Sequence, residues 1–340
     1  MRQVRKTLGS SAAARASAAR SEIRRIPTGS LSLDRELRGG WARGRMVELW
    51  GPEASGKTTI AILAMRSAVA AGGVAAYVDV EHALDIDYAE QVGLHPDSYV
   101  YSNPIDAETA LEAVRMFIRN GVDVIVCDTV AALATKAELR GEIQDEHVAR
   151  LARLMSRACK MMVAEVKANQ VVVIFVNQIR QNVGVRFGNP ETTPGGRALK
   201  YYASTRCEFR GAEKIKETKD GDPVGMWVKV FVKKTKTSIP FKRARFPLIF
   251  GKGVDRAREA LALALSLGVV TKAKRKKKGE EEEAPKGGKK GKGAEGGAKK
   301  KGKSGIAFGE RKWRGEAAFL KAAAEDPALL DQIEAEIARR

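Results

Sequence analysis

The most constraining feature of this chain is an eight-residue stretch, 51–58, which reads Gly-Pro-Glu-Ala-Ser-Gly-Lys-Thr. It fits the pattern G-x-x-x-x-G-K-[ST] and lies between a short apolar strand, Met46–Trp50, and a stretch of helical character, Thr58–Ala71. Glycines let backbone N–H groups wrap a phosphate, and a helix N-terminus favours negative charge. A chance glycine-rich loop lacks this context, so the stretch predicts a nucleotide-phosphate site on a strand–loop–helix unit.

The residues of this loop have distinct expected roles. Lys57 is expected to reach the β- and γ-phosphates of a nucleotide, and the Thr58 hydroxyl is expected to hold Mg²⁺. The candidate nucleotide-binding stretch as a whole consists of Gly51, Pro52, Glu53, Ala54, Ser55, Gly56, Lys57, Thr58 and Thr59.

Acidic residues end two further apolar strands. Val124–Asp128 delivers Asp128 at a strand end, where open α/β sheets bind ligands, and this carboxylate is expected to orient the water shell of Mg²⁺. An acid there is otherwise a common helix N-cap, and the phosphate loop favours the metal. Val78–Glu81 ends in two acids, of which Glu81 is the candidate general base. Spacing alone separates it only slightly from Asp79.

Apolar strands alternate with helical stretches over the first two thirds of the chain. Strands at Ala75–Val80, Val122–Cys127 and Val171–Val176 are hydrophobic on both faces, and a long helical stretch covers His147–Lys167. Such strands indicate an α/β fold with a mostly parallel central sheet flanked by helices. Further strands near 204–210 and 226–233 and a helix at 257–267 follow, and a small helical end-piece closes the chain.

The net charge of +20 suggests a polyanionic partner, but its distribution is uneven. Residues 1–25 hold seven basic residues and one acid, and residues 272–303 hold fourteen basic residues and five acids. Both segments are too polar to bury a core and are expected to be disordered. They are either solvated linkers or arms that bind nucleic-acid phosphates without sequence preference.

These changes in composition along the chain predict three parts. They are a basic segment at 1–25, a core at 26–255 that contains the phosphate loop, and a small C-terminal α/β domain at 256–340 that the 272–303 insert interrupts. No apolar run reaches the ~18–20 residues of a membrane span, and no secretory signal is evident. Three widely spaced cysteines form neither a disulfide framework nor a zinc knuckle. Together these observations favour a soluble cytoplasmic protein without a membrane partner.

Six segments together resemble the bacterial RecA recombinase family, a family of DNA-dependent ATPases. The match runs in order from about Ile26 to Asp255 and resumes more faintly from Ser304. The phosphate loop alone would indicate only an NTPase, and the last segment makes the match specific. The segments are Ile26–Asp34, Gly51–Thr59, Asp79–Asp85, Val124–Val130, Phe175–Arg180 and Phe187–Lys200.

The resemblance implies roles around a bound ATP. Glu81 would be the catalytic glutamate that polarises the attacking water. Asp85 and Tyr88 would cradle the adenine, although packing is the default role for such a tyrosine. Gln178 would sense the γ-phosphate and order the loop that follows it.

The resemblance also implies contacts between subunits and with DNA. Lys234 and Lys236 would reach ATP bound by a neighbouring subunit of a filament. The DNA loops would lie at about Leu139–Val148 and Ile179–Thr193. Phe187 would stack on bases unless it folds back on the core. Any arginine among the other candidates could equally form a surface ion pair. The other candidate DNA-binding residues are Arg153, Arg180, Arg186, Gly195, Gly196, Arg197, Arg206 and Arg210.

The chain departs from the family pattern in several places. The 25 residues before Ile26 lack the apolar stripe of the helix that docks neighbouring subunits, which puts filament stability in doubt. Gln181 and Arg186 stand where apolar residues are common, and Arg197 stands where asparagine is usual. The chain ends in Ala-Arg-Arg instead of an acidic tail.

Taken together, the residues and the resemblance predict a DNA-dependent ATPase. With ATP and Mg²⁺ it would form a helical filament on single-stranded DNA, pair that strand with homologous double-stranded DNA, and exchange strands in recombinational repair. The resemblance also implies self-cleavage of a LexA-like SOS repressor on the filament. The alternatives are a RecA-like DNA-binding ATPase paralogue without strand exchange and a basic DNA-coating protein.

Overall fold

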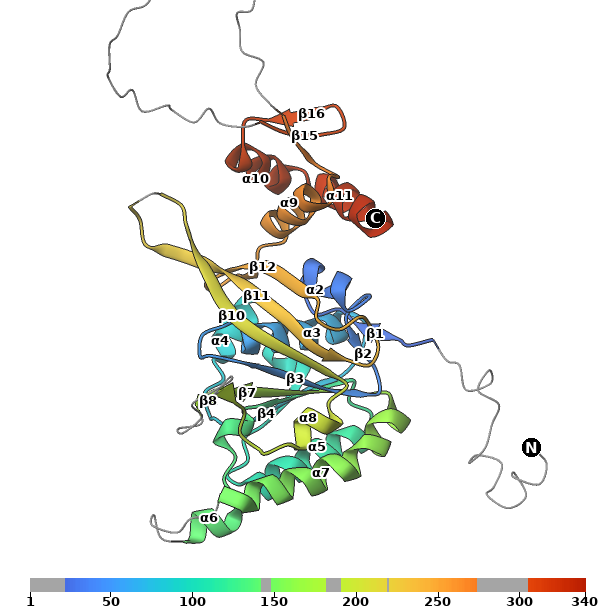
Figure 1. Ribbon diagram of the computed structural model, residues 1–340, viewed down its shortest axis with the longest axis vertical. Coiled ribbons are helices and arrows are strands. Elements are labelled where there is room, and N and C mark those ends of the chain that lie inside the picture. The colour runs from blue at the N-terminus through green and yellow to red at the C-terminus, as the bar shows by residue number, and fades with distance from the viewer. Residues whose placement is uncertain (1–21, 142–147, 182–190, 219, 274–304) are drawn as a thin grey trace, which may run out of the picture. The chain divides into compact units, whose positions relative to one another are not determined.

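The computed structural model describes residues 22–141, 148–181, 191–218, 220–273 and 305–340 (Figure 1). The chain divides into two compact units, Met1–Asp255 and Arg256–Arg340. Residues 1–21 of the expected segment 1–25, residues 274–303 of the expected insert 272–303, and parts of both expected DNA loops lie outside the described residues. Within the part of the chain that the structure describes, no helix has the length and apolar character needed to cross a membrane.

A nine-stranded sheet forms the first unit, in the order β13-β12-β11-β10-β3-β7-β6-β4-β5. Strands β10, β3, β7, β6, β4 and β5 pair in parallel, and β11, β12 and β13 extend the sheet in antiparallel fashion. The expected mostly parallel α/β fold is therefore confirmed. The bounds are β3 Arg45–Gly51, β4 Ala75–Asp79, β5 Tyr99–Ser102, β6 Val124–Asp128, β7 Val172–Gln178, β10 Thr205–Lys216, β11 Pro223–Thr235, β12 Arg243–Ile249 and β13 Gly253–Val254.

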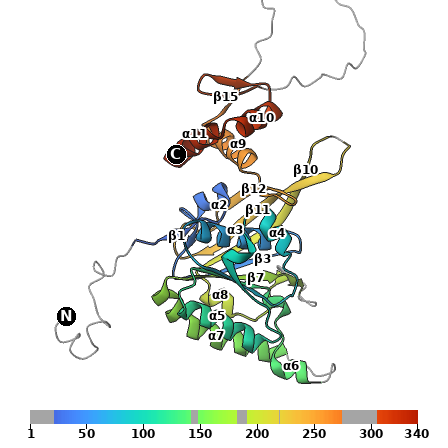
Figure 2. The same cartoon turned by 180° about the vertical axis from the view of Figure 1, so that it is seen from behind.

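Helices cover both faces of the parallel part of this sheet (Figure 2). On one face, α3 (Lys57–Ala70), α2 (Leu31–Glu36) and α4 (Ile86–Gln91) pack on a core that includes Val47, Leu49 and Ile174. On the other face, α5 (Ala107–Arg119), α7 (Val148–Asn169) and α8 (Ala198–Tyr202) pack around Phe175. Burial on both faces explains why these strands are apolar throughout.

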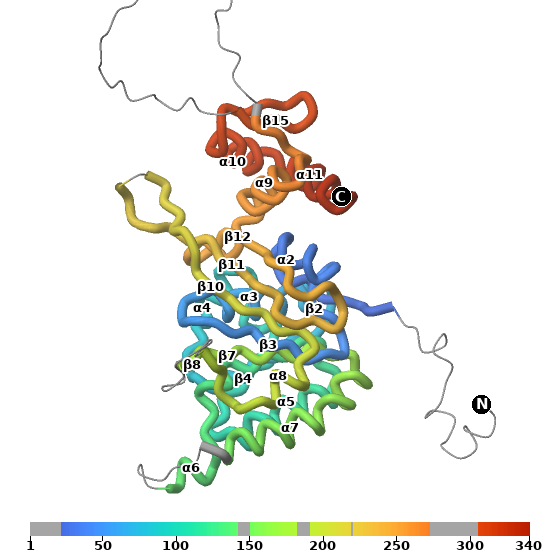
Figure 3. The backbone as a smooth tube through the Cα atoms, viewed as in Figure 1, coloured from blue at the N-terminus to red at the C-terminus, as the bar shows by residue number. Residues whose placement is uncertain are grey.

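The longest described strands, β10 and β11, pair as an antiparallel hairpin (Figure 3). Short elements fill the connections of the first unit. They are β1 Arg25–Ile26, β2 Trp41–Ala42, α6 Lys136–Arg140, β8 Arg180–Gln181, β9 Glu191–Thr192 and the 3₁₀ turns Pro96–Ser98 and Val130–Ala132.

The second unit contains three helices and a small antiparallel sheet. Its elements are α9 Arg256–Leu267, β14 Thr271–Ala273, β15 Gly305–Phe308, β16 Arg311–Trp313, α10 Glu316–Glu325 and α11 Pro327–Arg339. The three helices agree with the helical stretches in the sequence. The sheet β14-β15-β16 makes this unit an α/β module, as expected, although its individual strands, which are three or four residues long and lie on either side of residues 274–304, were not identified in the sequence.

Candidate active site

The phosphate loop connects the end of β3 to the start of α3. Gly56 adopts the left-handed conformation (φ 88°) at the N-cap of α3, and no side chain caps this end of the helix. A Cβ atom on Gly51 would lie 2.2 Å from the Phe209 carbonyl oxygen, so only glycine fits at that position. The loop therefore leaves backbone N–H groups at a helix N-terminus available for phosphate oxygens.

Lys57 lies folded across this loop. Its Nζ donates to the carbonyl oxygens of Gly51 at 3.1 Å and Pro52 at 2.6 Å. Burial lowers the pKa of Lys57, and the nearby carboxylates of Asp128, Glu81 and Glu53 oppose that shift. A partly desolvated ammonium interacts more strongly with an anion than a hydrated one, which suits a phosphate contact.

Thr58 and Asp128 meet where α3 begins and β6 ends. The Thr58 hydroxyl donates to Asp128 Oδ2 at 2.7 Å, and the buried Tyr77 hydroxyl donates to the same oxygen at 2.9 Å. Burial raises the pKa of Asp128, while these two hydrogen bonds and Lys57 oppose the rise. Thr129 caps the following turn through its own side chain, so Asp128 is not the N-cap there.

The two acids after β4 occupy different environments. Asp79 is buried, and its carboxylate accepts hydrogen bonds from Leu84 N at 3.0 Å and the Tyr101 hydroxyl at 2.9 Å. Glu81 is exposed beside the phosphate loop, and its Oε1 lies 3.5 Å from Gln178 Nε2. Partial burial raises the pKa of Glu81, with further contributions from Asp128, Asp79 and Glu53. The geometry thus favours Glu81 over Asp79 as a base.

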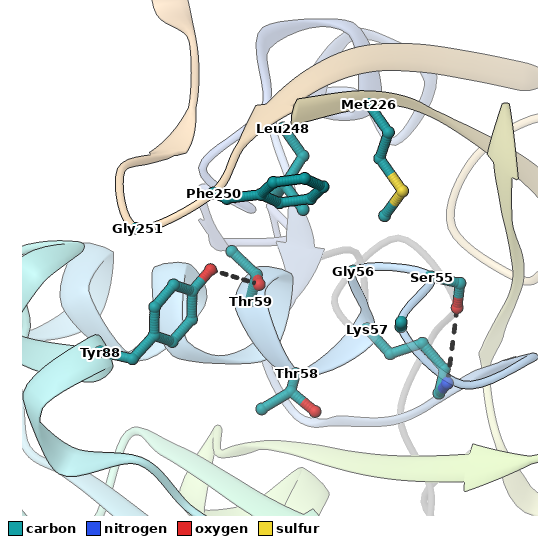
Figure 4. Close-up of a pocket in the computed structure, with 11 residues that line it drawn as sticks. Ser55, Gly56, Lys57, Thr58, Thr59, Tyr88, Met226, Leu248, Phe250 and Gly251 are labelled. Carbon is teal, nitrogen blue, oxygen red and sulfur yellow. Dashed lines mark hydrogen bonds between the residues drawn. The ribbon is translucent and has the colours of Figure 1, made fainter. Parts of the chain in front are cut away.

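A pocket of about 290 Å³ adjoins the phosphate loop (Figure 4). Tyr88 projects from α4 toward it, and its hydroxyl lies 2.7 Å from Thr59 Oγ1. Asp85 caps α4 by accepting a hydrogen bond from Tyr88 N at 2.9 Å, so it holds this tyrosine in place. Phe250 and Leu248 lie across the pocket from Tyr88.

Four lining residues were not foreseen as part of the site: Met226, Leu248, Phe250 and Gly251. They come from β11, from β12 and from the turn after it, more than 160 residues beyond the loop. Their apolar character resembles ordinary core in the sequence, and only the sheet order places them here. The pocket is consequently apolar on one side and lined by phosphate-binding backbone on the other.

Lys234 and Lys236 lie at the end of β11, away from the phosphate loop of their own chain. Lys234 Nζ donates to the carbonyl oxygens of Lys200 at 2.7 Å and Tyr201 at 3.0 Å, at the C-terminal end of α8. Burial lowers the pKa of Lys234, and Lys236 and Arg206 contribute. Lys236 is exposed beside Tyr201.

Of the five candidate DNA-binding arginines that the structure describes, three are exposed and two are held in ion pairs. Arg206 pairs with Glu48 at 2.5 Å, and Arg210 pairs with Glu191 and Glu208. For these two, the structure shows the ion pairs that sequence reasoning left open. The exposed arginines are Arg153, Arg180 and Arg197.

The two glycines just after the C-terminal end of the second expected loop are tightly packed. Gly195 (φ 81°) and Gly196 (φ 73°) are left-handed, and added Cβ atoms would lie 2.9 Å from Val130 and 2.8 Å from Ala152. Arg186, Phe187 and residues 142–147 of the first expected loop lie outside the described residues.

A face of the sheet beyond β10 carries aromatic and basic side chains that were not foreseen. Lys233 Nζ lies 4.2 Å from the centre of the Phe231 ring, and the Arg243 guanidinium lies 5.4 Å from it. Arg245 lies 4.2 Å from the ring of Trp227. We call Trp227, Lys229, Phe231, Lys233, Arg243 and Arg245 the aromatic–basic face.

The strand–loop–helix cradle, the acid at the end of the neighbouring strand and the parallel sheet define a P-loop NTPase. A family model described as the RecA N-terminal domain matches residues 1–255. The chain belongs to the RecA family. It is 48% identical over 257 residues to Protein RecA of Nocardia farcinica, covering 75% of this chain and 74% of that protein.

A second relative agrees with this family assignment. Protein RecA of Kineococcus radiotolerans is 51% identical over 240 residues, covering 70% of this chain and 68% of the relative. Among solved structures, the RadB recombinase is 22% identical with a TM-score of 0.49, covering 67% of this chain and 98% of that one.

Proposed function

We propose that this member of the RecA family is a recombinase of DNA repair whose ATP hydrolysis drives a DNA filament through cycles of assembly and release. The observation that carries the proposal is the Lys57, Thr58 and Asp128 constellation, on a chain that matches RecA proteins over most of its length. The family consists of DNA-dependent ATPases, and this chain retains the parts such an enzyme needs.

The residues present fit ATP and Mg²⁺. The position of Gly51, where a Cβ would collide with the backbone, keeps the cradle open for phosphates. Thr58 and Asp128 offer the hydroxyl and carboxylate oxygens that Mg²⁺ prefers, and they already lie 2.7 Å apart. When bound, the metal neutralises charge on the phosphates. The adenine would lie against Tyr88 and Phe250 in the apolar pocket.

Hydrolysis then uses side chains of this chain. The Glu81 carboxylate accepts a proton from the attacking water. The water oxygen bonds to the γ-phosphorus as the bond between that phosphorus and the bridging oxygen breaks, and ADP leaves. Lys57 stabilises the charge that develops on the phosphate oxygens. Gln178, within reach of Glu81, reports whether the γ-phosphate is present. Lys234 and Lys236 approach the ATP of a neighbouring subunit, which makes hydrolysis depend on the filament.

Strand exchange requires contact with two DNA molecules. We propose that the first single strand binds at the segment between Arg180 and Arg197. The strands β8 and β9 of this segment pair with each other. The aromatic–basic face offers a second surface, because cations beside half-buried aromatic rings suit phosphates and neighbouring bases. A DNA substrate also supports the proposed cytoplasmic location.

Two finer proposals follow from the family. The filament would promote self-cleavage of a LexA-like repressor. The competing paralogue without strand exchange would bind DNA yet fail to form filaments, which electron microscopy with a slowly hydrolysed ATP analogue distinguishes. A DNA-coating protein without catalysis would not require the Glu81 and Gln178 pair.

Lys57→Ala tests the proposed function. The variant should lose both ATP hydrolysis and ATP-dependent strand exchange, because the phosphate contact is gone. Strand exchange that survives this change would overturn the mechanism.

A further inference from the structure

Glu48 is a fully buried carboxylate that the mechanism above does not use. It lies in the middle of β3, and its side chain has no exposed surface. Arg206 Nε donates to its Oε2 at 2.5 Å from β10, and Asn177 Nδ2 donates to its Oε1 at 3.1 Å from β7. Buried charge is costly unless it is paired in this way, so a carboxylate at this point calls for an explanation.

Asn177 has its amide orientation fixed by these contacts. Its Nδ2 also donates to the Pro194 carbonyl oxygen at 3.2 Å, and its Oδ1 accepts the Gln178 backbone N–H at 3.0 Å. Turned over, the amide would direct its carbonyl oxygen at the Glu48 carboxylate and at Pro194 O. The negative charge of Glu48 therefore selects one orientation of Asn177.

The same contacts join two parts of the proposed machinery. Gln178 lies on one side of Asn177 and reaches Glu81, beside the phosphate loop. Pro194 lies on the other side, just before the packed glycines where the DNA segment rejoins the core. Arg206, which completes the cluster, pairs in register with Lys234 of β11.

We propose that Glu48 is a positioning residue that couples DNA binding to ATP hydrolysis, by holding Asn177 between Gln178 and Pro194. The inference rests on the proposed function. DNA that displaces the segment ending at Pro194 moves the Asn177 amide, and this changes where Gln178 meets Glu81. Glu48 touches neither nucleotide nor DNA in this scheme, and it acts through the orientation of its neighbour.

Glu48→Gln tests the coupling, because the amide keeps the shape but loses the charge. One end of the new amide must donate, so it cannot accept from both Arg206 and Asn177. ATP hydrolysis would be measured with and without single-stranded DNA, with thermal unfolding in parallel. DNA-stimulated kcat should fall by about tenfold or more, since small misplacement of reacting groups is costly, while the basal rate stays within about twofold.

Glu165→Gln is the matched control. Glu165 also pairs with arginine, in this case with Arg115 at 3.0 Å and Arg119 at 2.6 Å, but it joins α7 to α5 away from the cluster. It should retain DNA stimulation. A parallel loss of basal and stimulated rates in Glu48→Gln would reveal a merely structural role and overturn the proposal, as would full DNA stimulation in this variant.

A second variant guards against misfolding. Glu48→Asp keeps the charge for Arg206 but shortens the reach to Asn177, so it too should lose DNA stimulation. Full stimulation in a folded Glu48→Asp protein would contradict the coupling through Asn177. If the wild-type protein itself shows no DNA stimulation, the proposed function fails and this inference fails with it.

Discussion

Asp128 Oδ2 accepts two hydroxyl hydrogen bonds at once, from Thr58 at 2.7 Å and from Tyr77 at 2.9 Å. Tyr77 comes from β4 and approaches from the buried side, whereas Thr58 lies in the first turn of α3 on the nucleotide side. The carboxylate is thus held from the interior while its outer partner is the residue expected to bind Mg²⁺. Burial raises the pKa of Asp128 because it disfavours the charged carboxylate, and a nearby cation stabilises that charge.

Asp128→Asn should separate stability from activity. Because its pKa is raised by burial, charged Asp128 destabilises the folded state at neutral pH. That cost is absent at pH values below the unfolded-state pKa, grows as the pH rises above it, and is complete above the raised folded-state pKa. An asparagine retains an acceptor for Thr58 and Tyr77 without the charge. Thermal unfolding without nucleotide should therefore occur at a higher temperature at pH 7, while Mg²⁺-dependent hydrolysis falls by about 100-fold or more. An unchanged hydrolysis rate would remove Asp128 from the metal site.

Glu81→Gln and Asp79→Asn should fail in different ways. Glu81→Gln should reduce kcat by about 100-fold or more with ATP affinity nearly unchanged, because it removes only proton transfer. Asp79→Asn should instead lower stability by about 1–3 kcal/mol, because it weakens the buried acceptor of the Leu84 amide and the Tyr101 hydroxyl. Steady-state kinetics and urea unfolding distinguish the two, and interchanged phenotypes would reverse the assignment.

The pH profile provides a separate check on Glu81. A general base must be deprotonated, so kcat should fall on the acidic side as pH drops through its pKa. Partial burial and neighbouring acids raise that pKa, which puts the fall at a higher pH than for a free glutamate, whose pKa is about 4.3. The acid limb should disappear in Glu81→Gln. An identical limb in the variant would assign it to another group.

The apolar pocket should contribute to nucleotide affinity. Phe250→Ala removes one wall and should weaken ATP binding by about tenfold, in line with the loss of roughly 1–1.5 kcal/mol for an aromatic contact. Tyr88→Phe removes the hydrogen bond to Thr59 and should have a smaller effect. A fluorescent ATP analogue measures both. Wild-type affinity in Phe250→Ala would mean that the base lies elsewhere.

The aromatic–basic face should affect the second DNA molecule more than the first. Arg243→Ala should leave single-strand-stimulated hydrolysis intact, weaken duplex capture, and reduce the salt slope of that capture by about one. Lys321→Ala, an exposed lysine of the second unit, serves as the matched charge control. Equal loss in both variants would indicate a general charge effect.

The basic insert allows a related test. A variant without residues 272–303 should bind DNA with a flatter salt dependence, while ATP hydrolysis at saturating DNA persists. An unchanged salt slope would make this segment a linker.

The sequence predicted the parallel half of the sheet well, because the strands that contain residues such as Val124 and Ile174 are apolar on both faces. It also placed Lys57, Thr58 and Asp128, whose spacing is local or follows a strand end. The short edge strand β5 had no comparably strong signal, and the helix α5 was not identified although Asp106 caps it and its buried residues recur at helical spacing. Register between distant strands is invisible in one sequence, so the Phe250 wall of the pocket was missed.

Polar contacts across the sheet were the least accessible to sequence reasoning. Glu48 lies within an apolar strand, and nothing near it in the chain identifies Arg206 or Asn177 as its partners. Arg206 and Arg210 carried the charge expected of DNA contacts, but the buried Glu48 of the adjacent strand pairs with Arg206, and Glu208 and Glu191 pair with Arg210. Residue type predicts charge, whereas the fold determines what that charge contacts.

DNA strand exchange between a circular single strand and a homologous linear duplex tests the central claim most directly. With ATP and Mg²⁺, the wild-type protein should convert the two into a joined heteroduplex, and neither ADP nor the Lys57→Ala variant should support the conversion. A wild-type protein that hydrolyses ATP on DNA but yields no heteroduplex, or a Lys57→Ala variant that still yields it, would contradict the account.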